Sequence, residues 1–211
     1  MAAILEEICE LLQKGRAAKV KELVQQALDE NVDPFSILNQ GLLAGIDIIG
    51  TKFKNNEVFV PEVLVAARAM NAGIEILKPH LSSEDAAPKA TVVLGTVRGD
   101  LHDIGKNLVR IMLNGKGFNV IDLGVDVSPE QFYSSAVEND AKVVCCSSLL
   151  TTTMPEMRKV VELFEANNKR DSVKIMVGGA PVTQNFCDSI GADGYTSDAS
   201  SCAALALSYC S

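Results

Sequence analysis

The sequence predicts an α/β protein, with an N-terminal four-helix bundle followed by a domain built on a five-stranded parallel sheet. Two observations carry this prediction. Apolar residues recur at helical spacing through residues 1–81, and after residue 90 short apolar runs alternate with amphipathic segments. A polar segment at 82–89 separates the two patterns.

The first 81 residues predict four amphipathic helices joined by short connections. Asp33 followed by Pro34 is a cap and a first-turn proline, and opens the third helix. Pro61 opens the fourth helix and Pro79 closes it. Three glycines in the third helix either allow close packing or end the helix early: Gly41, Gly45 and Gly50.

The segment SerSerGluAspAlaAlaProLys at 82–89 is polar, small and proline-bearing. Both neighbouring patterns stop there, so we interpret it as a linker and a hinge. The predicted domains are therefore a helical bundle at 1–81, a linker at 82–89 and a sheet domain at 90–211.

The second pattern predicts strands alternating with helices. The strands are expected at 90–96, 118–123, 142–147, 173–177 and 194–196, and the helices at 105–116, 129–138, 154–168, 182–189 and 199–209. Apolar strands that alternate with helices indicate a parallel sheet covered on both faces and joined by right-handed crossovers. Five such strands predict a flavodoxin-like, or Rossmann-like, doubly wound sheet.

Composition narrows the function. A formal charge of −8 disfavours nucleic acid and anionic membranes as partners, because both require a basic surface. The N-terminus MAAILEEICELL is acidic where a signal peptide needs a basic flank, and no run reaches transmembrane length, so a cytoplasmic protein is expected. None of the six cysteines falls in a CxxC pair, and they are interpreted as buried, reduced thiols.

Open α/β sheets bind ligands at the carboxyl ends of their strands. Three of these ends carry glycine or hydroxyl residues, in the segments 97–105, 147–153 and 178–180. The first includes His102, one of two histidines, with Asp100 and Asp103 beside it. His102 fits a metal ligand whose other ring nitrogen is held by Asp100. It also fits a solvated loop histidine, with Asp103 as the cap of the next helix.

The three segments together resemble the cobalamin-binding signature, written Asp-x-His-x-x-Gly, Ser-x-Leu and Gly-Gly. Here these read GlyAspLeuHisAspIleGly at 99–105, SerSerLeu at 147–149 and GlyGly at 178–179. The segment PheValProGluValLeuValAlaAlaArgAlaMet at 59–70 is similar to the helical cap of the same family. Within that family, the resemblance is closest to small stand-alone corrinoid proteins of methyltransferase systems.

The resemblance implies roles for particular residues. His102 would be the lower axial ligand of cobalt, in place of the cofactor's own base. Asp100 would hold the proton that His102 takes up when a methyl cation leaves, and Thr153 would end that relay. Asp103 and Ile104 belong to the first motif, and Gly105 would open the space where the cofactor's tail enters. The remaining implied cofactor contacts are Ser147, Leu149 and Thr151 along the tail groove, Gly178 and Gly179 against the nucleotide, Tyr195 at the far end, and Phe59, Val60 and Met70 in the cap. Tyr195, Phe59, Val60 and Met70 fit plain packing as well.

The resemblance also implies a function in one-carbon metabolism. The chain would be a methyl carrier rather than a complete enzyme. A substrate-specific methyltransferase would load the cobalt, and a second methyltransferase would pass the methyl group to a thiol or to tetrahydrofolate. A corrinoid reductive activase is left open as a further partner. Methanol, methylated amines, betaines and methoxyarenes all stay open as donors.

Other functions compete for the same residues. One is a flavodoxin-like or receiver-like domain that holds a nucleotide or a flavin, but a receiver needs an acidic pocket with an aspartate and a lysine, and no such set is evident at the strand ends. A subunit of a cobalamin mutase would need a substrate barrel that this chain does not encode, although a separate chain could supply one, so this alternative stays open. A cobalamin-sensing regulator would need a basic DNA-binding module. A hydrolytic metal site usually needs several histidine ligands. His80, the second histidine, sits beside Pro79 at the end of the bundle, so the chain cannot assemble a site with several histidines.

Overall fold

The structure is a computed structural model of the 211-residue chain, and it describes residues 2–81 and 88–210. Contacts divide the chain into two compact units, Met1–Ala87 and Pro88–Ser211. Most of the predicted linker, 82–87, lies outside the described residues. Within the described ranges, no helix combines the length and the apolar character that crossing a membrane requires.

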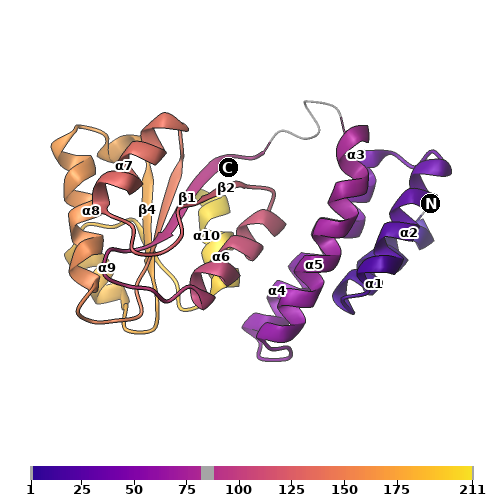
Figure 1. Ribbon diagram of the computed structural model, residues 1–211, viewed down its shortest axis with the longest axis horizontal. Coiled ribbons are helices and arrows are strands. Elements are labelled where there is room, and N and C mark those ends of the chain that lie inside the picture. Colours follow the sequence, from indigo (N-terminus) through magenta and orange to yellow (C-terminus); the bar gives the residue numbers. More distant parts are fainter. Residues whose placement is uncertain (1, 82–87, 211) are drawn as a thin grey trace. The chain divides into compact units, whose positions relative to one another are not determined.

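The first unit is helical, as predicted (Figure 1). Its elements are α1 (Ala2–Gln13), α2 (Ala17–Asp29), α3 (Pro34–Ser36), the π-helix η1 (Ile37–Leu43), α4 (Ala44–Lys54), α5 (Val60–Leu77) and the 3₁₀ turn η2 (Lys78–His80). The third predicted helix runs through α3, η1 and α4, with a wider π-helical stretch in its middle that apolar spacing does not distinguish from α-helix.

The sequence signals for the third helix are confirmed at the level of single contacts. The Asp33 carboxylate accepts a hydrogen bond from the Ser36 N–H at 2.9 Å, which caps α3 ahead of Pro34. A Cβ atom on Gly41 would lie 3.0 Å from Ile8, and one on Gly45 would lie 3.0 Å from Leu12. These two glycines therefore allow α1 to pack closely and do not end the helix.

The second unit is a five-stranded, all-parallel sheet with the order β2-β1-β3-β4-β5. The strands are β1 (Thr91–Thr96), β2 (Asn119–Asp122), β3 (Val143–Ser147), β4 (Lys174–Gly178) and β5 (Gly194–Tyr195). The predicted doubly wound fold is confirmed. Its chain order reverses between β1 and β3, so the carboxyl ends of these two strands form the switch point where such sheets bind ligands.

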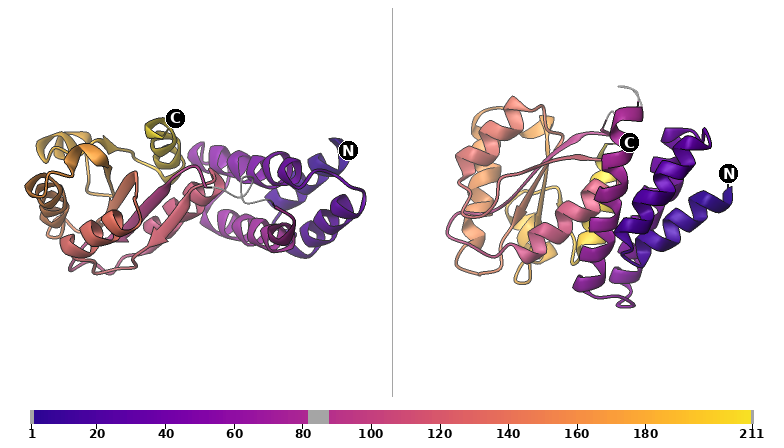
Figure 2. Two further views of the ribbon diagram at one scale, coloured as in Figure 1. Left: turned by 90° about the horizontal axis from the view of Figure 1, so that it is seen from above. Right: turned by 45° about the vertical axis from the view of Figure 1, so that its right-hand side comes forward.

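Helices cover both faces of this sheet (Figures 1 and 2). They are α6 (Ile104–Gly115), α7 (Pro129–Glu138), α8 (Met154–Ala166), α9 (Gln184–Ser189) and α10 (Ala199–Tyr209), with a 3₁₀ turn η3 (Arg170–Ser172) before β4. Phe132 of α7 and Phe164 of α8 are fully buried in one continuous apolar core with Val144 and Ile175 of the sheet. On the other face, α6 packs against α10. The sheet is therefore buried on both sides, as its apolar strands predict.

The cysteines are all free, as expected, but only four of them are buried. Burial raises the pKa of the Cys146 thiol. The prediction that all six are buried is wrong for Cys9 and Cys210, which are half-buried. Cys9 lies on a partly solvated face of α1, and Cys210 follows the last turn of α10, where the core ends.

Candidate functional site

The candidate site lies in the loop that follows β1, at the switch point of the sheet. His102 occupies this loop, and its side chain is 51% exposed. The Nδ1 atom of its ring lies 2.7 Å from Oδ1 of Asp100, and the His102 backbone N–H donates to the same oxygen at 3.0 Å. No hydrogen-bond partner for Nε2 is found within 2–81 and 88–210, so this nitrogen is the one available to a ligand.

The second carboxylate oxygen of Asp100 is bound by the segment that follows β3. Oδ2 accepts from the Leu149 N–H at 2.7 Å and from the Thr153 hydroxyl at 3.0 Å. The Leu150 N–H adds a longer contact of 3.3 Å. Asp100 is completely buried, so these donors replace the water that a carboxylate would otherwise bind. The structure thus brings together His102, Asp100 and Thr153, which the sequence had grouped.

Two opposing effects act on the Asp100 carboxyl. Burial raises its pKa, but hydrogen bonds from the backbone and ring of His102, from the Leu149 N–H and from the Thr153 hydroxyl lower it further. The pKa of Asp100 therefore lies well below its usual range. The carboxylate stays ionised, and it favours a proton on Nδ1 of His102 over one on Nε2.

Ser148 is a member of this network that the sequence reasoning left out. It is fully buried, and its hydroxyl oxygen lies 2.7 Å from that of Thr153 and 3.5 Å from Oδ2 of Asp100. It also donates to the Leu150 carbonyl at 3.0 Å. Its signal in the sequence was a second hydroxyl inside the Ser-x-Leu motif, at the position where the motif accepts any residue.

The glycines of the three motifs meet different surroundings. A Cβ atom on Gly105 would have no neighbour within 4 Å, so open space lies beside the first turn of α6. Gly179 has a φ of +131°, and a Cβ there would come within 1.8 Å of the Ser148 carbonyl oxygen. Gly178 has no such constraint, because its nearest neighbour would be the Thr196 carbonyl oxygen at 3.9 Å. Among Gly105, Gly178 and Gly179, the local backbone therefore requires glycine only at Gly179.

Large apolar side chains flank His102 and are exposed to solvent. Leu101 is 72% exposed and Ile104 is 68% exposed, and Leu149 and Leu150 at the end of β3 are exposed as well. Such a concentration of exposed leucine and isoleucine at one edge of a sheet is typical of a surface that a ligand or a partner covers. The residues present therefore suit a large, mostly apolar cofactor with a metal at its centre.

Three other predicted residues lie apart from the Asp100 network. Asp103 occupies the N-cap position of α6, but its side chain makes no capping bond and instead accepts from the Asn107 side chain at 3.1 Å. Asp103 is therefore the N-cap residue of α6 by position, as one interpretation predicted, but its side chain does not cap the helix. Thr151 is exposed. Tyr195 is half-buried and packs against the apolar core that α7, α8 and α9 cover, the packing role that the sequence had left open.

The predicted cap residues belong to the helical unit. Phe59, the N-cap residue of α5, is 66% exposed, and Val60 is half-buried. Met70 is 2% exposed and shares a helical face with Gly73, whose Cβ would meet Leu42. Met70 thus has the surroundings of a core residue of the bundle, whereas Phe59 has the exposure that a shielding role requires.

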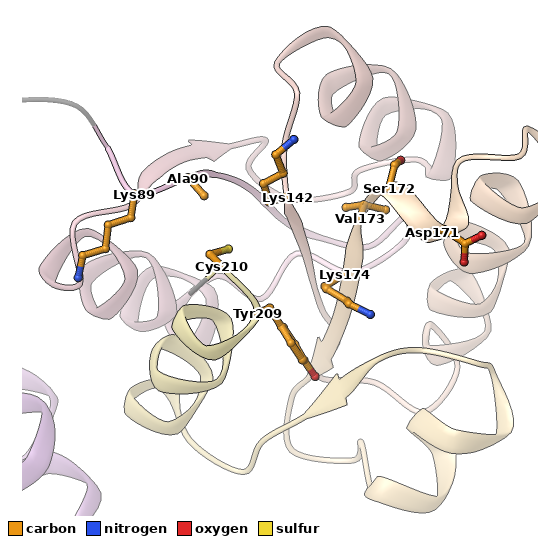
Figure 3. Close-up of a pocket in the computed structure, with 9 residues that line it drawn as sticks. All are labelled: Lys89, Ala90, Lys142, Asp171, Ser172, Val173, Lys174, Tyr209 and Cys210. Atoms are coloured by element: carbon orange, nitrogen blue, oxygen red, sulfur yellow. The ribbon is translucent and has the colours of Figure 1, made fainter. Parts of the chain in front are cut away.

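A hollow of about 410 Å³ lies at the opposite edge of the sheet, near the amino ends of β1 and β4 (Figure 3). Lys89, Lys142 and Lys174 line it, but their ammonium groups point in different directions. Lys142 is paired with Asp140 and Lys174 with Asp193. The hollow therefore offers no convergent set of charges, and His102 lies at the other end of the strands.

Comparison with protein families matches almost the whole chain. Residues 90–203 match a family model described as a B12 binding domain, and residues 4–78 match a second B12 binding domain model. A corrinoid protein of Desulfitobacterium hafniense (strain Y51) is 40% identical over 207 residues, which cover 97% of this chain and 96% of that protein. Dimethylamine corrinoid protein 1 of Methanosarcina acetivorans is 42% identical over 204 residues, covering 93% and 96%.

Solved structures of cobalamin proteins are similar to this chain as well. One similar chain belongs to the methanol:cobalamin methyltransferase complex MtaBC from Methanosarcina barkeri, with a TM-score of 0.89 and 28% identity over 99% of this chain and 80% of that chain. Another is a cobalamin-binding protein from Desulfitobacterium hafniense DCB-2, with a TM-score of 0.81 and 29% identity over 97% and 98%. Both likenesses extend over the helical and the α/β units.

Proposed function

Because this chain belongs to the B12-binding family of corrinoid proteins, we propose that it is a methyl carrier that holds the cobalt of cobalamin through Nε2 of His102. The observation that carries the proposal is the His102 ring. Its Nδ1 is bound to a buried carboxylate at 2.7 Å while half of the side chain faces solvent. Metal-binding histidines commonly have this arrangement, with one nitrogen held by a carboxylate and the other directed to the metal.

The surroundings of His102 support a corrinoid in particular. When bound, cobalamin supplies a cobalt atom that accepts and releases a methyl group. Leu101, Ile104 and Leu149 offer exposed apolar surface beside His102 for the corrin ring. The open space beside Gly105 and the bare backbone of Gly178 suit the tail of the cofactor.

The chain's own residues control the proton on His102. The Asp100 carboxylate, with its lowered pKa, keeps a proton on Nδ1 and leaves the lone pair of Nε2 free to bind a metal. The Thr153 hydroxyl and the Leu149 N–H hold the Asp100 carboxylate in place.

The helical unit would act as a cap that keeps water from the bound cofactor. Phe59 and Val60 are the side chains proposed for this contact, and Met70 is not, because it lies in the bundle core. Delivery of a methyl group requires the cap to move away, so that each partner protein reaches the cofactor.

The proposed partners are two methyltransferases, one that loads the methyl group and one that removes it to a thiol or to tetrahydrofolate. A corrinoid reductive activase is the third. Di- and trimethylamine are the first donors to test, because several relatives are named as di- or trimethylamine corrinoid proteins.

The test compares three full-length proteins reconstituted with hydroxocobalamin: wild type, His102→Ala and His80→Ala. His80 is the matched control, since it is the second histidine of the chain and lies exposed in the helical unit. After gel filtration, wild type and His80→Ala are expected to retain a corrinoid with a nitrogen-ligated visible spectrum. His102→Ala is expected to show the base-off spectrum. A wild-type protein that retains no corrinoid, or a His102→Ala spectrum equal to that of wild type, would refute the proposal.

A further inference from the structure

The loop that carries His102 has no regular secondary structure of its own. Residues 101–103 lie between a turn and the start of α6, and the His102 side chain is half exposed. Hydrogen bonds rather than a helix or strand must therefore fix where the ring lies. Asp100 orients the ring, but Asp100 and His102 belong to the same loop. Residues outside the loop must therefore hold the backbone of Asp100 and of His102.

Thr96 holds the loop from the sheet. It is the last residue of β1 and is fully buried, and its hydroxyl donates to the His102 carbonyl oxygen at 2.9 Å. Both hydrogen-bonding groups of the Thr96 backbone are themselves paired, with the segment that follows β2. Its N–H donates to the Gly124 carbonyl at 2.9 Å, and its carbonyl accepts from the Val127 N–H at 2.9 Å. The hydroxyl is thus a donor on a rigid base, directed at the backbone of His102.

Asp126 holds the loop from the neighbouring connection between β2 and α7. Its N–H donates to the Asp100 carbonyl at 3.0 Å, and its Oδ1 accepts from the Gly99 N–H at 2.7 Å. Asp126 has a φ of +56°, a conformation that aspartate tolerates better than most residues. Because Asp126 is exposed, its side chain fills no core, and its contact with Gly99 is what the position provides.

We propose that Thr96 and Asp126 are positioning residues for His102. Thr96 at the end of β1 and Asp126 after β2 together hold the Gly99–His102 loop, so that Nε2 lies where it can bind the cobalt of a corrinoid. This inference depends on the proposed function, since it concerns the same ligand. It assigns roles to two residues outside the three recognised motifs. Loss of either contact should loosen the ring without removing it.

Thr96 is tested with two variants and a control. Thr96→Val keeps the shape but removes the donor, and Thr96→Ser keeps the hydroxyl. Thr96→Val loses one hydrogen bond, and the net contribution of a typical hydrogen bond corresponds to about a 5-fold change in an equilibrium constant. The ratio of nitrogen-ligated to base-off hydroxocobalamin is therefore expected to fall by about 5-fold in Thr96→Val. Thr96→Ser should resemble wild type. Thr91→Val makes the same change at the opposite end of β1 and should leave the ratio unchanged.

Asp126 is tested with Asp126→Gly and Asp126→Asn. Glycine accepts the positive φ and removes the side-chain acceptor, whereas asparagine keeps both the acceptor and the conformation. Asp126→Gly should lower the ratio by about 5-fold, and Asp126→Asn should lower it less.

The outcomes separate this inference from the proposed function. If wild type retains no nitrogen-ligated corrinoid, the proposed function fails. If wild type does retain it, and Thr96→Val and Asp126→Gly keep the wild-type ratio, the positioning roles are refuted while the carrier function stands. Should Thr96→Val fail to fold, Asp126→Gly decides, since its side chain lies on the surface.

Discussion

Two adjacent glycines, Gly178 and Gly179, should differ strongly in how well they tolerate alanine. Gly179 has a φ of +131°, and an added Cβ would come within 1.8 Å of the Ser148 carbonyl oxygen. Gly178 has ordinary backbone geometry and no neighbour closer than 3.9 Å. We predict that Gly179→Ala strongly destabilises the α/β unit and that Gly178→Ala does not.

The magnitude follows from two contributions. An alanine in this backbone region costs about 1–3 kcal/mol. The Ser148 carbonyl must also retreat, and this disturbs the neighbouring Leu149 N–H, which donates to Asp100 at 2.7 Å. Loss of a hydrogen bond to a charged group costs about 1.5–3 kcal/mol. Gly179→Ala should therefore lower the free energy of unfolding by about 2.5–6 kcal/mol, and Gly178→Ala by less than about 1 kcal/mol.

Tyrosine fluorescence provides a selective assay. The chain has no tryptophan, and its three tyrosines, Tyr133, Tyr195 and Tyr209, all lie in the second unit. Urea unfolding followed by this signal reports on the α/β unit without interference from the helical one. A Gly179→Ala protein within about 1 kcal/mol of wild type, or a Gly178→Ala protein destabilised as much as Gly179→Ala, would refute the reasoning.

Three further predictions concern other parts of the structure. Lys106 is almost fully buried and binds both carboxylate oxygens of Asp122, at 2.7 and 2.6 Å, so Lys106→Met should destabilise the α/β unit by about 2–4 kcal/mol in urea unfolding. Replacing Asp122 by Leu as well should recover much of this loss, and no recovery would contradict the ion-pair explanation. In the bundle, Met70→Ala should cost about 2–4 kcal/mol, whereas Phe59→Ala should cost less than about 0.5 kcal/mol, measured by thermal unfolding of the helical circular-dichroism signal. Equal losses would show that Phe59 is packed. The lowered pKa of Asp100 means that its carboxylate stabilises the fold above the unfolded-state pKa of about 3.9 and loses this effect as the pH falls further. The difference in unfolding free energy between wild type and Asp100→Asn should therefore stay constant from neutral pH down to about pH 4 and shrink as the pH falls further, and a difference that stays constant below about pH 4 would contradict the assignment.

Local signals were sufficient for the elements of the fold. The Asp33–Pro34 cap, the helical stripes of the bundle and the apolar runs that became β1, β3 and β4 each depend on neighbours within a few residues. The structure places these three strands within two residues of the predicted bounds. The end of α8 shows the limit of this. The predicted helix continues to 168, but it ends at Ala166, and Asn168 has a φ of +54°, a turn that apolar spacing does not reveal.

Long-range contacts decided the rest. From the sequence, Lys106 is one more charged residue in an amphipathic helix, but Asp122, sixteen residues later, pairs with it in a buried position. Ser148 and Asp126 looked like ordinary loop residues, and each acquires its role only when a distant segment reaches Asp100 or Gly99.

The sequence by itself determined the α/β class, the order of the elements and the histidine and carboxylate pair, because these are written in short periodic patterns and in one motif. Only the tertiary structure decided how the pair is held. The hydrogen bonds that hold the loop come from residues at or after the ends of β1, β2 and β3. Thr96 at the end of β1 is near the loop in sequence, but the donors and acceptors after β2 and β3 lie 27 to 53 residues from their partners in the loop. Such contacts depend on the register of the parallel sheet, which places the carboxyl ends of these strands side by side.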